Sequence, residues 1–90
     1  MAAVPAQVAV EVLVHIPEEH VPALRRPPAG VTTFFAHVPS LPPLRIGELF
    51  FLEIGGRAVA QATADWLKPC STCPDGWIVY WKPESICWLN

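Results

Sequence analysis

Residues 46–66 read IGELFFLEIGGRAVAQATADW, and this stretch predicts a β-hairpin at the centre of the chain. Two largely apolar runs, residues 46–54 and 57–66, flank the pair Gly55 and Gly56. A Gly-Gly pair between such runs is typical of a two-residue turn, because a primed turn needs positive φ at both central positions. The sequence therefore predicts two paired strands joined at these glycines.

A two-residue turn also sets the expected register of the hairpin. It pairs Ile54 with Arg57, Leu52 with Val59 and Phe50 with Gln61 on one face, and Phe51 with Ala60 and Leu49 with Ala62 on the other. The second face carries a row of small side chains, which leaves space for a bulky group: Ala58, Ala60, Ala62 and Ala64. We therefore expect the alanine face in the core and the face with Arg57 in water.

Short runs rich in β-branched and aromatic residues predict the remaining strands. They are residues 7–16 (QVAVEVLVHI), 31–38 (VTTFFAHV) and 77–81 (WIVYW). Pro17, followed by two glutamates, suits the start of a short helix that Pro22 limits to a turn or two. Residues 84–89 fit either a closing strand or one helical turn. The number of predicted strands indicates a mostly β fold: a small antiparallel β-barrel of five or six strands, with one or two short helical turns.

Composition limits the class of protein. The chain has 90 residues, enough for a single domain over residues 1–90, of which 52% are apolar and 16% charged. Disorder needs the opposite balance, and a net charge of −2 argues against a basic nucleic-acid arm. No apolar run reaches the roughly 20 residues of a membrane span, and the first residues lack the basic start of a signal peptide. We therefore expect a cytoplasmic protein that does not bind membranes.

The apolar excess also predicts a partner. A domain of this size buries only about 60–65% of its unfolded surface, and this chain has more apolar residues than such a core hides. A contiguous exposed patch would mark a homodimer or another protein partner. The alternative is that scattered alanines and valines account for the excess.

The centre of the chain resembles PUA-like domains, the superfamily that includes the ASCH and EVE families. The matching residues are Ile46-Gly47-Glu48 before the first hairpin strand, and the second strand from Gly56 through Ala58, Ala60 and Ala62. The resemblance implies a compact barrel with a cleft for a nucleotide, a flipped base or an RNA end. Some ASCH proteins are instead amidohydrolases of modified nucleosides that use a lysine, a threonine and a glutamate. Here the early Gly-x-Lys-x-x-Glu signature is missing, since residues 30–33 read GVTT.

Tryptophan is abundant near the C-terminus and supplies candidate ligand-binding residues. Exposed aromatic side chains stack on bases, and cations bind phosphates or base edges. We expect Trp66, Trp77 and Trp81 to stack, and Arg57, Lys68 or Lys82 to supply the charge. Trp66 and Trp81 are the best candidates to border a pocket, because a lysine follows each closely in sequence. The alternative is that the tryptophans fill the core of a small domain.

The motif Cys70-x-x-Cys73 is a candidate metal site. Two thiolates at this spacing can share one zinc ion, and Cys87 with one of the three histidines would complete four ligands. Free thiols in a surface turn and a redox-labile disulfide are the alternatives. A thioredoxin-like site would need a βαβ context, which the sequence does not predict.

These observations lead to three functional hypotheses. The first is a non-catalytic binding module of PUA-like type that recognises a nucleotide, a modified base or a single-stranded nucleic acid, including RNA. The second is a protein-interaction or dimerisation module with an aromatic and apolar interface. The third is a nucleoside amidohydrolase of ASCH type. The first hypothesis needs no cofactor other than a possible zinc ion.

Overall fold

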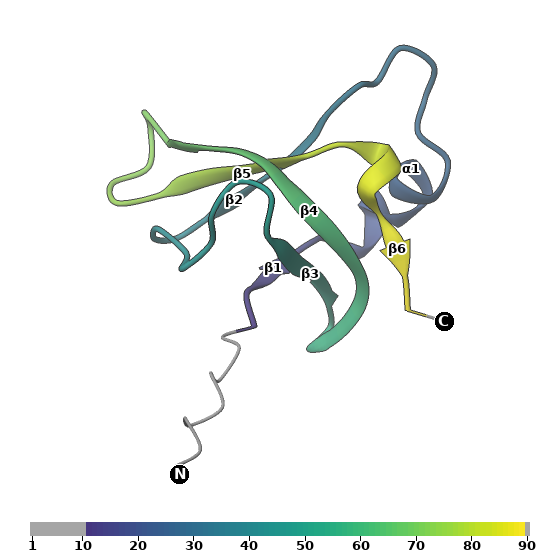
Figure 1. Cartoon of the computed structure of the whole chain (residues 1–90), viewed down its shortest axis with the longest axis horizontal. Helices are drawn as coiled ribbons and strands as arrows, with labels where there is room; N and C mark the ends of the chain where they lie inside the picture. Colours follow the sequence, from purple (N-terminus) through teal and green to yellow (C-terminus); the bar gives the residue numbers. More distant parts are fainter. Residues whose placement is uncertain (1–10, 90) are drawn as a thin grey trace, which may run out of the picture.

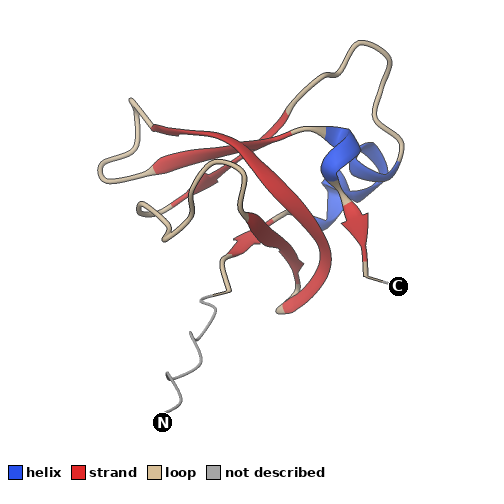
Figure 2. Ribbon diagram, in the orientation of Figure 1, coloured by secondary structure: helices blue, strands red, loops and turns tan. Residues whose placement is uncertain are grey.

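The computed structural model of the protein describes residues 11–89. Six strands form one curled sheet in the order β1-β3-β4-β5-β2, and β6 adds to β4 beside this path. The sheet curls into a half-barrel, with the helical segments at one end (Figures 1 and 2). In chain order the elements are β1 (Leu13–His15), the 3₁₀ turn η1 (Glu18–His20), α1 (Val21–Arg25), β2 (Phe34–Val38), β3 (Leu49–Ile54), β4 (Arg57–Pro69), β5 (Trp77–Trp81), the 3₁₀ turn η2 (Pro83–Ser85) and β6 (Cys87–Trp88).

The prediction of a small, mostly β domain with six short strands and a short helix is confirmed. One pairing departs from the purely antiparallel barrel that the sequence predicts, because β1 runs parallel to β3. Parallel neighbours need a long crossover connection. Residues 16–48 supply it, and they hold both α1 and the opposite edge strand β2. Residues 7–10 of the first predicted strand lie outside the described residues.

A β-bulge changes the register of the central hairpin. Gly55 and Gly56 have φ of 60° and 85°, as the predicted turn requires, and Ile54 pairs with Arg57 as expected. The register then shifts, so that Leu52 pairs with Ala60 instead of Val59. The remaining predicted pairs were wrong for the same reason: one extra residue in β4 turns every later side chain to the other face.

The bulge places a different Phe and Leu in the core from the pair that the predicted register placed there. Phe50 and Leu52 are fully buried opposite the alanines, whereas Leu49 is exposed and Phe51 is half-buried. The alanine row faces the core as predicted, except that Ala58 precedes the bulge and is exposed. These small side chains make room for a large group, since Ala64 pairs with Trp81.

Trp81 is the largest buried side chain of the domain. The ring of Phe50 meets it edge-on at 5.5 Å between centroids, and the ring of Phe34 lies at 6.1 Å. Edge-to-face and tilted pairs at these distances add to the stabilisation from burial. Trp81 therefore joins the two halves of the curled sheet, β3 on one side and β2 on the other.

A second bulge lies at Asp65, between Ala64, which pairs with Trp81, and Trp66, which pairs with Tyr80. Without it, Ala64 and Trp66 would share a face, because side chains alternate along a strand. The extra residue instead directs Trp66 to the outer face, where 55% of its surface is exposed. Between the two bulges the even-numbered residues of β4 face the core, and after the second bulge the even-numbered residues face outward.

The helical segment covers one end of the half-barrel. Pro22 lies in the first turn of α1, where its missing N–H costs nothing, and Leu24 is the buried residue of the helix. The guanidinium of Arg25 lies 4.0 Å from the ring centroid of Trp88, which attaches the end of α1 to β6. No helix within residues 11–89 is long and apolar enough to cross a membrane.

Candidate ligand pocket and aromatic face

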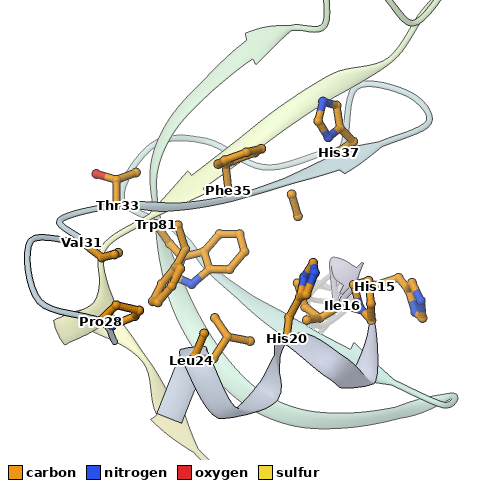
Figure 3. A pocket seen from close by; sticks show the side chains of 14 residues that line it. His15, Ile16, His20, Leu24, Pro28, Val31, Thr33, Phe35, His37 and Trp81 are labelled. Atoms are coloured by element: carbon orange, nitrogen blue, oxygen red, sulfur yellow. The ribbon is translucent and has the colours of Figure 1, made fainter. Parts of the chain in front are cut away.

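A cavity of about 610 Å³ opens at the seam of the half-barrel, where β1 and β2 are the two end strands of the sheet. Its volume falls in the range of about 300–1,000 Å³ that is typical of small-molecule sites. Residues from β1, α1, the segment before β2, β2 itself and β5 line it (Figure 3). They are His15, Ile16, Pro17, His20, Ala23, Leu24, Pro28, Val31, Thr33, Phe34, Phe35, Ala36, His37 and Trp81.

Trp81, which lines this cavity, also has an unused hydrogen-bond donor. Its Nε1 is buried and has no hydrogen-bond partner among the described residues. In Figure 3 the nitrogen edge of the indole points toward the side of Leu24. A buried donor without a partner costs about 1–3 kcal/mol, so an acceptor that reached this nitrogen would recover that free energy.

All three histidines of the chain line the same cavity. His15 Nδ1 lies 3.4 Å from Glu53 Oε1, and Glu53 Oε2 accepts the N–H of Gly56 at 2.7 Å. The hairpin turn therefore fixes the carboxylate that orients this ring. Sequence analysis missed the cluster, because His20 and His37 belong to segments that meet only when the sheet curls.

The outer face of the sheet carries a row of three aromatic side chains beside the cavity. Phe35 of β2 pairs with Tyr80 of β5, and Tyr80 pairs with Trp66 of β4. The rings of Phe35 and Tyr80 lie 6.0 Å apart, and Phe35 is 58% exposed. Phe35 also lines the cavity, so the row and the cavity form one continuous surface.

Lys68 adds a positive charge to this aromatic row. Its Nζ lies 5.9 Å from the ring centroid of Tyr80. The next row of the same face runs from His37 through Ile78 to Lys68. A cation over an aromatic ring is kept near it by the negative face of the ring. The outer face thus combines stacking surfaces with one lysine.

The other predicted ligand-binding residues lie elsewhere. Trp77 pairs with Val38 and Pro69 at the far end of β5 and does not line the cavity. Arg57 begins β4, nine residues before Trp66, which is roughly 30 Å along a strand. Lys82 borders a separate hollow of about 190 Å³ with two acidic residues. The structure therefore places Trp81 in the wall of the cavity and Trp66 and Lys68 on the outer face, and it leaves Trp77, Arg57 and Lys82 away from both.

The structure also separates the predicted zinc ligands. Cys70 and Cys73 lie in the β4–β5 loop, whereas Cys87 lies in β6 and pairs with Gln61. Gln61 is nine residues from Cys70, so the two positions differ by roughly 30 Å along β4. Figure 1 shows the loop at the left end of the molecule and β6 near the right end. Within residues 11–89 no three or more His, Cys, Asp or Glu side chains gather where they could hold a metal ion, so Cys70, Cys73 and Cys87 do not come together in one site.

The residues that an ASCH-type hydrolase would need are not gathered at the cavity. The carboxylate of Glu48 accepts the backbone N–H of Arg45 at 2.7 Å and stabilises the turn before β3. The backbone of Glu48 bonds to Ala64, which is four residues, or roughly 13 Å, from Lys68 along β4. Neither Glu48 nor Lys68 lines the cavity.

No family model, no curated protein and no solved structure matches this chain. The cavity and the aromatic face beside it are therefore the features of the molecule that indicate a function.

Proposed function

We propose that the protein is a PUA-like, non-catalytic binding module for single-stranded nucleic acid, and that it holds one base in the seam cavity. Neighbouring bases stack on the outer aromatic row. The observation that carries the proposal is the continuity of the two surfaces through Phe35, next to the buried and unpaired indole N–H of Trp81. Three free thiols suit a cytoplasmic location, which is part of the proposal.

The chemistry of the cavity suits a nucleobase. Its walls are apolar and aromatic, which matches the faces of a base, and its polar groups are few. The Trp81 N–H can donate to a ring nitrogen or carbonyl oxygen of the base. Thr33 and the histidines supply further donors and acceptors at the wall.

The outer row suits the bases on either side of the pocket. Aromatic stacking is worth about 1–3 kcal/mol per base and tolerates any sequence. Trp66 and Phe35 are both more than half exposed, so their ring faces are open to a ligand. Lys68 is the one predicted cation on this face, so we expect few phosphate contacts and a weak dependence on salt.

Fluorescence anisotropy with short labelled RNA and DNA oligonucleotides at low salt tests the proposal. We expect single strands to bind, and Trp66→Ala and Phe35→Ala each to weaken binding about 5- to 150-fold, which corresponds to about 1–3 kcal/mol. Arg57→Ala and Lys82→Ala are matched controls, because they remove a cation outside the site. Absence of binding, or equal losses in the controls and the site variants, would contradict the proposal.

Trp81→Phe tests the pocket itself. The substitution keeps an aromatic ring in the core and removes the indole N–H. We expect it to weaken binding of a free nucleoside, measured by calorimetry, while the far-UV circular dichroism stays that of the wild type. Unchanged nucleoside affinity in a folded Trp81→Phe variant would exclude the proposed hydrogen bond.

Self-association is a second candidate function, and one observation favours it. Leu13 and Leu49 are both more than half exposed. Leu13 pairs with the half-buried Phe51, which shares the outer face of β3 with Leu49. An apolar patch of this kind suits a homodimer interface. Light scattering at high micromolar concentration should then give twice the chain mass, and Leu49→Asp should give a monomer. A monomeric wild type would exclude self-association.

A further inference from the structure

The β4–β5 loop carries two cysteines that the proposed binding site does not use. Cys70 follows β4, and Ser71 and Thr72 form a turn between it and Cys73. Both thiols are free, Cys73 is exposed and Cys70 is half-buried. A turn brings its first and fourth residues within about 7 Å, which overlaps the Cα separation of about 4.4–6.8 Å that a disulfide spans.

Backbone hydrogen bonds shape the loop around these cysteines. Cys70 donates its N–H to the carbonyl of Gly76 at 2.8 Å, and Gly76 donates to the carbonyl of Cys73 at 2.9 Å. A Cβ at position 76 would lie only 2.8 Å from the Cβ of Cys73. Gly76 is therefore required for the close approach that holds Cys73 in place.

The two sulfurs have different surroundings. Thr72 Oγ1 lies 3.5 Å from the sulfur of Cys70 and 3.8 Å from the sulfur of Cys73. Hydrogen bonds from the thiol of Cys73, the hydroxyl of Thr72 and the backbone N–H groups of both residues lower the pKa of Cys70 to about 6. The same contact with Cys70 raises the pKa of Cys73. These two pKa shifts favour the thiolate at Cys70 and the protonated thiol at Cys73.

We propose that Cys70 and Cys73 form a thiol–disulfide exchange site at the tip of the β4–β5 hairpin, which reacts with low-molecular-weight disulfides. The Cys70 thiolate attacks one sulfur of the disulfide RS–SR; the S–S bond breaks, a Cys70–SR bond forms and RS⁻ leaves. Cys73 then loses its proton to solvent, and its thiolate attacks the Cys70 sulfur and expels the second RS⁻. The Cys70 thiolate and the Cys73 thiol are oxidised to one disulfide, RS–SR is reduced, and the proton from Cys73 together with one proton from solvent converts both RS⁻ to RSH.

Exchange fits this loop better than metal binding does. It needs two sulfurs, whereas a closed zinc site needs four ligands, and residues 11–89 offer no third ligand near the pair. The division into a nucleophilic and a protonated cysteine is the one that Cys-x-x-Cys exchange requires. The proposal does not depend on nucleic-acid binding, because neither thiol lies in the cavity.

Mass spectrometry of the full chain in glutathione redox buffers tests the proposal. After reduction and removal of the reductant, oxidised glutathione should convert the wild type to a form lighter by two hydrogen atoms, with the new bond between Cys70 and Cys73. Cys73→Ser should stop at the first step and accumulate a mixed disulfide at Cys70. Cys70→Ser should form no intramolecular disulfide, and Cys87→Ser should behave as the wild type does.

Gly76→Ala separates loop geometry from the mere presence of two thiols. It keeps both cysteines and displaces Cys73, so we expect the second step to slow at least several-fold while the mixed disulfide at Cys70 accumulates. A wild type that forms only mixed disulfides, at Cys70 and Cys87 alike, would overturn the proposal. Stoichiometric zinc that protects both cysteines from oxidised glutathione would also overturn it, in favour of a metal site shared between chains.

Discussion

The two halves of β4 contrast in what they present to the rest of the molecule. From Ala60 to Ala64 the strand turns small side chains inward, where they pack beside Phe50 and Trp81. From Trp66 onward it turns large side chains outward, beside Tyr80 of the neighbouring strand. Asp65 lies between the halves as an inserted residue that reverses the alternation. One strand thus serves both the core and the proposed binding face.

Removal of the Trp81 side chain should have the largest effect on stability among the tests of the inward and outward halves of β4. Because Trp81 is 1% exposed and packs between two aromatic rings, Trp81→Ala should lower the free energy of unfolding by about 3–5 kcal/mol. Trp66→Ala is the matched variant in the outward half, and it should cost less than about 1 kcal/mol. Urea denaturation followed by circular dichroism measures both. Equal losses would contradict the assignment of the two tryptophans to opposite faces.

A pair of leucine substitutions tests the first bulge in the same strand. Ala62→Leu adds volume to a fully buried position and should lower stability by about 1–3 kcal/mol. Ala58→Leu lies before the bulge at an exposed position, and it should change stability by no more than about 0.5 kcal/mol. If Ala58→Leu proved as costly as Ala62→Leu, the uninterrupted register of the hairpin would be the correct one.

A smaller effect, which depends on pH, is expected for the β4–β5 loop that follows the outward half of β4. It concerns the rate at which Cys70 reacts with a disulfide. At pH 6.5 Cys70, with a pKa of about 6, should react with a disulfide about fivefold faster than free cysteine, whose pKa is about 8.5. The gain in thiolate fraction outweighs the lower nucleophilicity of a more acidic thiolate. At pH 9 both thiols are mostly ionised and free cysteine should react faster. The other titratable groups of the loop are Cys73 and Asp75, and Lys68 precedes it on β4.

Peptide mapping of Cys70 in the Cys87→Ser variant measures this rate ratio across pH. Thr72→Val removes the second hydrogen-bond donor to the Cys70 sulfur and should move the crossover to higher pH. A ratio that does not change between pH 6.5 and pH 9 would show that Cys70 has an ordinary pKa.

The smallest predicted effect concerns the single lysine of the outer face. Each phosphate contact with a single strand contributes about 0.7 to the slope of log affinity against log salt concentration. Lys68→Ala should therefore reduce the slope by about 0.7, while Lys82→Ala should leave it unchanged. Oligonucleotide titrations at salt concentrations between about 50 and 200 mM measure the slopes of both variants. A larger change with Lys82→Ala would place the phosphate path over the hollow beside Asp65 and Glu84.

Local chemistry explains what could be predicted of the fold. Gly55 and Gly56 specify the turn because of their positive φ, and the strand Trp77–Trp81 lies where its β-branched and aromatic residues predict it. The predicted register of the hairpin holds for the first two pairs beyond the turn and is wrong from Leu52 onward. The bulges of β4 depend on its pairing with β3 and β5, and no residue pattern within the strand marks them.

The candidate site was harder to predict, because it is assembled from distant segments. Trp66 and Lys68 were visible as an aromatic and a cation close together in sequence. The three histidines and Phe35 were not, since only the curl of the sheet brings β1, α1 and β2 around one cavity. Arg57 and Lys82 were chosen by charge alone, and charge does not specify the position of a residue along a strand.

The sequence by itself therefore determined the β class, the hairpin turn, the inward alanine row and the loop that carries Cys70 and Cys73. These features follow from backbone preference and side-chain size over a few residues. The tertiary structure alone decided the parallel pairing of β1 with β3, the two bulges of β4 and the cavity at the open seam. The parallel pairing and the cavity depend on how segments that are 30 or more residues apart share one core around Trp81. The bulges depend on how β4 fits both of its neighbours, and no pattern within one strand carries that information.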